Sequence, residues 1–267
     1  MDSATFGYLR KLVKQQAAIV LEREKEYLAE TRLASLARDN GFDSIPPMVT
    51  QLRLQPFGEL HRRVIESLTT NETSFFRDRH PFDAMRTTII PRLLASHPTS
   101  LTIWCAAASS GQEPYSVAMV IRDHFPRIVA TTRIIASDLS REMLARVDRG
   151  TYTQFEVGRG LSERALAKHF VQRGADWIVR PELRAMLEVK ELNLAAAFPA
   201  LPRIDLVLVR NVLIYFDQPA KRDILSRIRR VMNPEGALVL GASETMLGLD
   251  TGLERCAVDK AIYYRPT

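Results

Sequence analysis

Two runs of apolar residues end in side chains that suit a nucleoside ligand. The run 101–106 (LTIWCA) is followed by small residues up to Gly111, whose backbone can approach a ligand closely, and the helix predicted next offers free N–H groups at its start. The run 132–138 (TRIIASD) ends in Asp138. An acidic residue at that place in doubly wound folds accepts hydrogen bonds from ribose hydroxyls. Together the two segments predict a nucleoside site.

The first loop also limits the kind of nucleoside. It lacks the GxGxxG pattern whose glycines admit a pyrophosphate, so a nicotinamide dinucleotide is disfavoured. S-adenosylmethionine, which has no pyrophosphate, is the first candidate. Two other interpretations stay open, because Gly111 can simply belong to a tight turn and Asp138 can simply favour the start of the next helix.

A third polar pair, Arg210-Asn211, follows the apolar run LVLV at the end of a predicted buried strand. Open α/β sheets bind their ligands at the carboxyl ends of such strands, so the pair predicts a site. Tyr215 follows four residues later in the same loop. The segment 71–78 (NETSFFRD) places polar residues around two phenylalanines, and from residue types alone it is equally a linker anchored by aromatic rings.

The elements that must position these residues alternate between strand and helix. Strands are predicted over 101–106, 132–138, 204–211, 236–243 and 256–265, with helices over 113–125, 140–150 and 218–232. Such alternation predicts a Rossmann-like parallel sheet with helices on both faces. Residues 150–192 interrupt it with a helix over 162–170 and short antiparallel strands, which predicts a small inserted β subdomain.

The N-terminal quarter has a different pattern. Residues 1–70 read as helical, with Asn40-Gly41 ending the second helix, a break at Ile45-Pro46-Pro47, and a further helix over 58–68. The sequence therefore predicts a small all-helical domain of residues 1–70 ahead of an α/β domain of residues 71–267.

Composition excludes several classes of protein. No run of about 18 apolar residues occurs and the N-terminus has no apolar leader, so neither a membrane span nor a secretory signal is expected. The two cysteines lie far apart, which favours the reducing cytoplasm, and the five histidines have no metal-ligand spacing and are expected at surface or boundary positions. The net charge of +6 favours an acidic partner, and an acidic protein surface is preferred over nucleic acid because no basic tail occurs.

The motifs together resemble one family, the CheR-type chemoreceptor glutamate methyltransferases. The matching stretches are NETSFFRD (71–78), WCAAASSGQEPYSVAM (104–119), ASDLSREMLARVDRGTY (136–152), RNVLIYFD (210–217) and GASE (241–244). The resemblance implies a cytoplasmic enzyme that transfers a methyl group from S-adenosylmethionine to glutamate side chains of chemoreceptors. It also implies a helical domain that docks on the receptor's helical bundle, with no metal, and a monomer is expected.

The resemblance assigns roles to ten residues in this chain. It implies that Asn71, Thr73 and Arg77 reach over the cofactor and that Glu113 and Asp138 hold its polar groups. It further implies that Asn193 and Leu194 border the adenine and that Arg210 and Asn211 line the crevice. Arg77 and Tyr215 would lie nearest the reacting methyl group, as the catalytic pair.

Two departures from the family pattern limit the resemblance. The second N-terminal helix (22–40) mixes arginines with glutamates where the family has a basic face, so the docking surface stays open. The insert is short around 173–179, which favours an enzyme that does not need a tethering peptide from the receptor C-terminus. A methyltransferase of the same fold with another protein or a small carboxylate as substrate, and an inactive cofactor-sensing module, remain alternatives.

Overall fold

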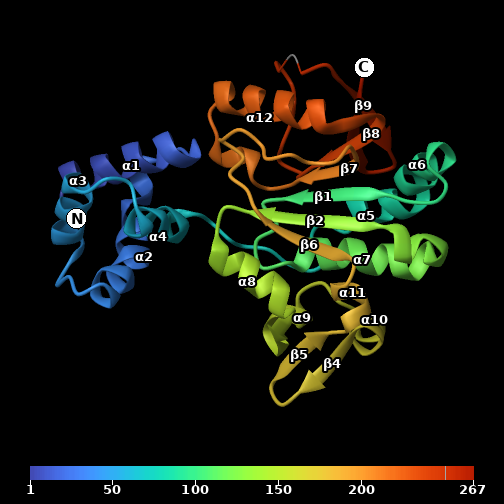
Figure 1. The fold of residues 1–267 in the computed structure, drawn as a ribbon, viewed down its shortest axis with the longest axis horizontal. Coiled ribbons are helices and arrows are strands. Elements are labelled where there is room, and N and C mark those ends of the chain that lie inside the picture. The colour runs from blue at the N-terminus through green and yellow to red at the C-terminus, as the bar shows by residue number, and fades with distance from the viewer. Residues whose placement is uncertain (250) are drawn as a thin grey trace. The chain divides into compact units, whose positions relative to one another are not determined.

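The structure is a computed structural model that describes residues 1–249 and 251–267, and its chain divides into two compact units (Figure 1). One unit comprises Met1–Thr70 with Tyr215–Lys221, and the other comprises Asn71–Ile214 with Arg222–Thr267. Among the helices within those described ranges, none combines the length and the apolar character that a membrane crossing needs.

The first unit is helical, as the sequence predicts. Its elements are α1 (Ser3–Ala17), the 3-10 turn η1 (Arg23–Lys25), α2 (Glu26–Asp39), α3 (Ile45–Leu54) and α4 (Glu59–Leu68). The predicted end of α2 is confirmed, because Asn40 is its C-cap and Gly41 adopts a positive φ of 78°. Leu9, Leu33 and Met48, from three different helices, are fully buried and form part of its core.

The predicted break at Ile45-Pro46-Pro47 is wrong, because these residues begin α3. The first N–H groups of a helix have no carbonyl partner within it, so a proline in the first turn loses nothing and presets the helical φ. Proline therefore marks a helix start here, with Ser44 in extended conformation before it.

The short segment Tyr215–Lys221 belongs to the helical unit, although it lies far from residues 1–70 in sequence. The Val20 amide donates to the Tyr215 carbonyl oxygen at 2.8 Å, and Ile19 and Phe216 form an isolated antiparallel bridge. The Lys14 ammonium lies 3.2 Å from the Asp217 carboxylate. Three contacts of different kinds thus fix the backbone on which Tyr215 is carried.

The second unit is built on a seven-stranded sheet, which confirms the predicted α/β fold. Its strands are β1 (Thr102–Ala106), β2 (Arg133–Asp138), β6 (Leu187–Glu191), β7 (Ile204–Val209), β8 (Met232–Leu240), β9 (Leu253–Val258) and β10 (Ala261–Pro266). They stand in the order β6-β2-β1-β7-β8-β10-β9. The first five are parallel, whereas β10 is antiparallel to both β8 and β9.

The helices follow from this strand order. The crossovers through α7 (Gln112–His124) and α8 (Arg141–Arg149) lead from β1 outward to β2 and β6, whereas α12 (Gln218–Val231) leads from β7 the other way to β8. Because such crossovers are right-handed, α7 and α8 cover one face and α12 the other, as Figure 1 shows. The order reverses between β1 and β7, so a crevice is expected at their carboxyl ends.

Two predicted elements need correction. Residues 187–191, assigned to the insert, form β6, which pairs in parallel with β2 from Ile134↔Leu187 to Asp138↔Glu191. The strand predicted over 256–265 is a hairpin of β9 and β10 that turns at Asp259, whose φ is 49°. A strand followed by a tight turn without glycine or asparagine has no obvious turn signal in sequence, so the two strands read as one.

The insert itself is smaller than predicted. It holds β3 (Thr151–Thr153), α9 (Gln154–Gly158), α10 (Glu163–His169), β4 (Phe170–Arg173), β5 (Asp176–Val179) and α11 (Pro181–Arg184), with a three-stranded antiparallel sheet in the order β3-β5-β4. Between residues 71 and 101, α5 (His80–Ala84), a π-helical turn η2 (Met85–Ile89) and α6 (Ile90–Ser96) lead into β1.

Candidate functional site

The loop after β1 is shaped by Gly111. Its φ of 99° lies in the region that favours glycine, and a Cβ added there would come within 2.8 Å of the Tyr152 hydroxyl oxygen. That hydroxyl donates to the Ser110 carbonyl oxygen at 2.7 Å, so Tyr152 of β3 supports the loop from below. Gly111 is therefore required both for the turn and for the close packing beneath it.

Asp138, at the end of β2, is tied to the same loop. One carboxylate oxygen accepts from the Ser109 amide at 2.8 Å and the other from the Ser140 amide at 2.9 Å. Burial raises the pKa of this carboxyl, against these hydrogen bonds, which lower it. The N-cap of α8 is Ser140 rather than Asp138, and the backbone amides of Ser109, Ser140 and Leu139 leave about one of the four lone-pair sites of the carboxylate for a further donor. This geometry favours a ligand-binding aspartate over a helix-capping one.

Ser109 joins the loop to the polar segment 71–78. Its hydroxyl donates to the Asn71 carbonyl oxygen at 2.7 Å while its amide holds Asp138. Ser109 is not among the predicted site residues, because a serine in a loop of small residues has no distinguishing pattern. Asn71 and Asp138, 67 residues apart in sequence, are thus joined through one residue.

Arg210 links three segments at the carboxyl end of β7. Its guanidinium donates to the Glu113 carboxylate at 2.8 Å, to the Asp78 carboxylate at 2.9 Å and to the Arg77 carbonyl oxygen at 2.7 Å. The Arg210 side chain is 1 % exposed, and it lies 5.5 Å from the centre of the Phe82 ring. Burial raises the pKa of the Glu113 carboxyl, and Arg210 opposes that rise. Arg210 therefore fixes where the backbone of Arg77 lies.

Asn211, the next residue, adopts a left-handed φ of 59° and is held by Glu244. The Glu244 carboxylate accepts four backbone N–H groups, those of Asn211, Val212, Leu213 and Gly241, at 2.6–2.9 Å. Glu244 lies in the GASE motif, but its role was missed because nothing local to that motif shows that it reaches another loop. It joins the loops after β7 and β8.

Beyond β6, Asn193 and Leu194 lie beside the end of β2. The Leu192 amide donates to the Asp138 carbonyl oxygen at 3.0 Å, which places the start of this segment. The Asn193 side-chain oxygen accepts from the Ala195 amide at 2.9 Å, and Leu194 is buried. Asn193 and Leu194 therefore come just after β6, the strand that pairs with β2 beside Asp138.

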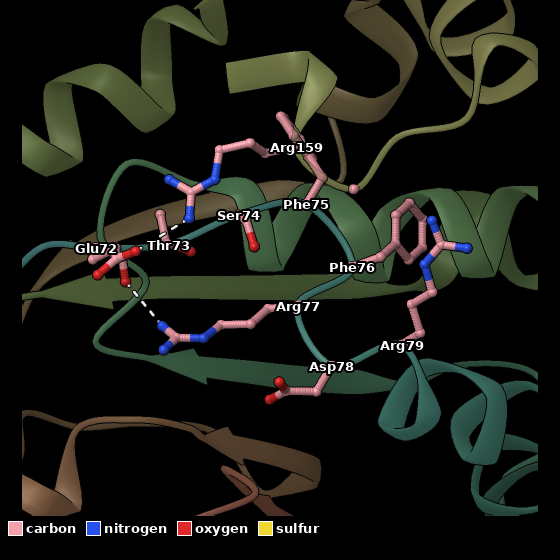
Figure 2. Close-up of a pocket in the computed structure, with 10 residues that line it drawn as sticks. Glu72, Thr73, Ser74, Phe75, Phe76, Arg77, Asp78, Arg79 and Arg159 are labelled. Atoms are coloured by element: carbon pink, nitrogen blue, oxygen red, sulfur yellow. Dashed lines mark hydrogen bonds and ion pairs between the residues drawn. The ribbon is translucent and has the colours of Figure 1, made fainter. Parts of the chain in front are cut away.

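Arg77 and Thr73 line a pocket of about 360 Å³ in the segment 71–78 (Figure 2). Its lining is Glu72, Thr73, Ser74, Phe75, Phe76, Arg77, Asp78, Arg79, Arg159 and Gly160. Phe75 is fully buried, with its ring edge-to-face against Tyr152 and Phe170 of the insert. The segment 71–78 is therefore anchored by an aromatic ring, as expected of a plain linker, and it also lines a pocket.

Of the predicted site residues, all except Tyr215 lie in the α/β unit. Ser109, Arg210 and Glu244 connect their segments through hydrogen bonds, whereas Tyr215 is carried by the helical unit. Two of the histidines expected at surface or boundary positions are buried. His61 lies 3.0 Å from the Leu52 carbonyl oxygen, and His169 lies 3.0 Å from the Asp123 carboxylate, so polar partners compensate for their burial.

Comparison with known proteins decides the family. Residues 4–69 match the domain described as "CheR methyltransferase, all-alpha domain", and residues 71–262 match "CheR methyltransferase, SAM binding domain". The chain belongs to the CheR methyltransferase family. These two matches cover both units of the chain apart from its ends, so the resemblance seen in the motifs is confirmed.

Individual CheR relatives are similar over nearly their whole length. The "Chemotaxis protein methyltransferase 1" of Pseudomonas aeruginosa is 38% identical over 269 residues, with 98% of each chain covered. The "Chemotaxis protein methyltransferase Cher2" of Pseudomonas putida is 36% identical over 266 residues, with 97% of each covered. The Escherichia coli "Chemotaxis protein methyltransferase" is 32% identical, covering 94% of this chain and 87% of the relative. This CheR protein is an S-adenosylmethionine-dependent methyltransferase of chemotaxis.

Proposed function

We propose that this CheR enzyme transfers a methyl group from S-adenosylmethionine to glutamate side chains in the cytoplasmic helical bundle of chemoreceptors. The observation that carries the proposal is the contact of Arg210 with the Arg77 carbonyl oxygen and with Glu113. It holds Arg77 of the segment 71–78 at the carboxyl end of β7, next to the strand-order reversal where α/β sheets bind ligands.

The residues at this edge fit S-adenosylmethionine. Asp138 offers a buried carboxylate for the two ribose hydroxyls, and the positive φ of Gly111 lets the loop beside it turn tightly against the core. Asn193 and Leu194 would border the adenine, and Asn71, Thr73, Glu113 and Asn211 would hold the remaining polar groups, with Arg77 and Arg210 beside them. When bound, the cofactor would supply a methyl group on a sulfonium, which is transferred to an in-line nucleophile with the neutral thioether S-adenosylhomocysteine as the leaving group.

The residues of the chain have little acid–base work to do in this reaction. A glutamate carboxylate is already ionised at neutral pH, so its oxygen can form the new bond to carbon without a general base. Orientation and exclusion of water then dominate the catalytic contribution. We assign Arg77 to hold the attacking carboxylate by charge-assisted hydrogen bonds, and Tyr215 to position the reactants with its hydroxyl or its ring face.

The decisive experiment identifies the bond that is formed. Purified protein and methyl-labelled S-adenosylmethionine are incubated with a cytoplasmic fragment of a chemoreceptor, and the labelled fragment is treated with mild alkali. A glutamate ester releases its label as methanol, whereas a methylated amine or ether keeps it. Alkali-stable label, or label only on a different protein or a small carboxylate, would reject the proposal. The same assay on Tyr215→Phe and Tyr215→Ala separates the hydroxyl from the ring.

Cofactor binding depends on Asp138 in this proposal. Asp138→Ala is expected to weaken binding of S-adenosylhomocysteine, measured by calorimetry, by about 1–3 kcal/mol, because the ribose hydroxyls lose their acceptor. Asp148→Ala, an exposed aspartate on α8 in the same unit, is the matched control and is expected to bind normally. Equal affinities of the two variants would remove Asp138 from the site.

We further propose that residues 1–70 form the receptor-docking domain and residues 71–267 the methyltransferase domain. The net charge of +6 of the whole chain, of which residues 1–70 contribute +1 (ten Lys and Arg against nine Asp and Glu), supports an acidic protein partner, so receptor affinity should fall as salt increases. The two-residue turn between β4 and β5, with Arg173 paired to Asp176, supports methylation that is independent of a tethering peptide. The two free cysteines support a cytoplasmic enzyme.

A further inference from the structure

The insert makes a close contact with the segment 71–78. Gly160, in the connection between α9 and α10, has a φ of 105°, and a Cβ built on it would lie 1.8 Å from the Phe75 carbonyl oxygen. The two backbones are therefore as close as a glycine allows. The adjacent Arg159 guanidinium lies 3.1 Å from the Glu72 carboxylate.

Arg77 is bound to the same glutamate from its other side. Its guanidinium donates to the Glu72 carbonyl oxygen at 3.0 Å. Figure 2 shows the side chains of Arg77 and Arg159 approaching Glu72 from two directions, one from the segment 71–78 and one from the insert. Glu72 thus contacts both arginines: its carboxylate pairs with Arg159, and its carbonyl oxygen accepts from Arg77.

The support behind Arg159 is rigid. Arg159 is the C-cap of α9. The start of that helix is fixed by a capping box in which Thr153 and Glu156 exchange hydrogen bonds. Arg146 of α8 also pairs with Glu156. The short helix that carries Arg159 is thereby tied to a helix of the main sheet.

We propose that Arg159 is a positioning residue for Arg77, acting through Glu72. This inference rests on the proposed function, because it assumes that Arg77 holds the attacking carboxylate. By fixing the Glu72 carboxylate, Arg159 fixes the rotation of the Glu72 peptide unit, whose oxygen aligns the Arg77 guanidinium. Arg159 need not touch the substrate for this effect.

Stability is a poor measure of this role, since both partners are well exposed. The Arg159 side chain is 45% exposed and that of Glu72 is 65% exposed, and pairs of this kind add little to folding. A small misplacement of a positioning group can nevertheless slow a reaction strongly. The inference therefore predicts a loss of turnover with little change in thermal stability.

The test measures kcat and KM for the receptor fragment, affinity for S-adenosylhomocysteine and the melting temperature. Arg159→Ala is expected to lower kcat roughly 5- to 10-fold, with cofactor affinity and melting temperature close to those of the wild type. Arg159→Lys keeps a cation for Glu72 and is expected to recover most of the rate. Arg164→Ala removes another exposed arginine, from α10 of the same insert, and is the matched control.

The Arg77→Ala background separates the two proposals. There, Arg159→Ala is expected to cause no further loss, because the group that it positions is gone. An equal loss in both backgrounds, or an Arg159→Ala rate equal to that of Arg164→Ala, overturns the inference while the role of Arg77 stands. If Arg77→Ala itself turns over normally, the proposed role of Arg77 fails, and the inference fails with it.

Discussion

Arg77→Ala is expected to lower kcat for receptor methylation by about 100-fold, while S-adenosylhomocysteine still binds. A charge placed to orient an attacking carboxylate is worth a few kcal/mol in the transition state, which sets this magnitude. The fold should survive, because the contact that Arg210 makes is with the Arg77 carbonyl oxygen and not with its side chain. Initial rates with labelled S-adenosylmethionine, calorimetry and a thermal melt measure the three quantities.

Two further variants define what the Arg77 side chain contributes. Arg77→Lys should not fully restore the rate, because an ammonium cannot reproduce the planar fork that holds a carboxylate. Arg86→Ala removes an arginine nine residues away that pairs with Asp83 on the surface, and it should turn over as the wild type does. Wild-type kcat in Arg77→Ala would exclude Arg77 from catalysis and leave only its place in the pocket.

The strands at the centre of the sheet were predictable because their sequence carries the mark of burial on both faces. All six residues of β7 are buried, and so are four of five in β1, which produces the continuous apolar runs read from the sequence. The positions of Gly111 and Asp138 were predictable for a related reason. Asp138 ends one such run and Gly111 lies in the short loop after another, so their place at the carboxyl edge of the sheet comes with the strands themselves.

The strand at one edge of the sheet was not predictable in the same way. Four of the five residues of β6 are only partly buried, and its sequence LEVKE alternates like a strand of a small exposed sheet. Glu188 and Lys190 form an ion pair on it, as is common on edge strands. Nothing local distinguishes it from the strands of the insert, and its partnership with β2 is decided by tertiary pairing.

The connections within the site were out of reach for the same physical reason. Arg210 and Asn211 were predicted at the site, but the partners of Arg210 lie 97 and 132 residues away in sequence. Glu244 is separated by more than 30 residues from three of the amides that it binds. Residue types at a strand end can indicate a site, whereas the network that holds the site rigid is set by the fold.

Arg210→Met is expected to destabilise the α/β unit by about 3–5 kcal/mol, because it leaves the Glu113 carboxylate buried without its cation. The Glu113 side chain is 12% exposed, so water cannot replace the guanidinium effectively. Methylation should fall further than stability alone explains, since the Arg77 carbonyl oxygen loses its donor at the same time. Urea unfolding measures the free energy, and receptor methylation under folding conditions measures the rate.

The pH dependence of this loss identifies its cause. Burial already raises the pKa of Glu113, and removing Arg210, which opposes that rise, should raise it further. A carboxyl whose pKa is higher in the folded than in the unfolded state binds more protons when the protein is folded. The free energy of unfolding of the protein therefore falls as the pH rises through the interval between the two pKa values. The loss in free energy of unfolding caused by Arg210→Met should therefore be larger at pH 8 than at pH 5.

A double variant is the control. In Arg210→Met/Glu113→Gln, which has no buried carboxylate at this place, most of the pH dependence should disappear. A deficit that is the same at both pH values would assign it to lost packing against Phe82, and not to an unpaired charge.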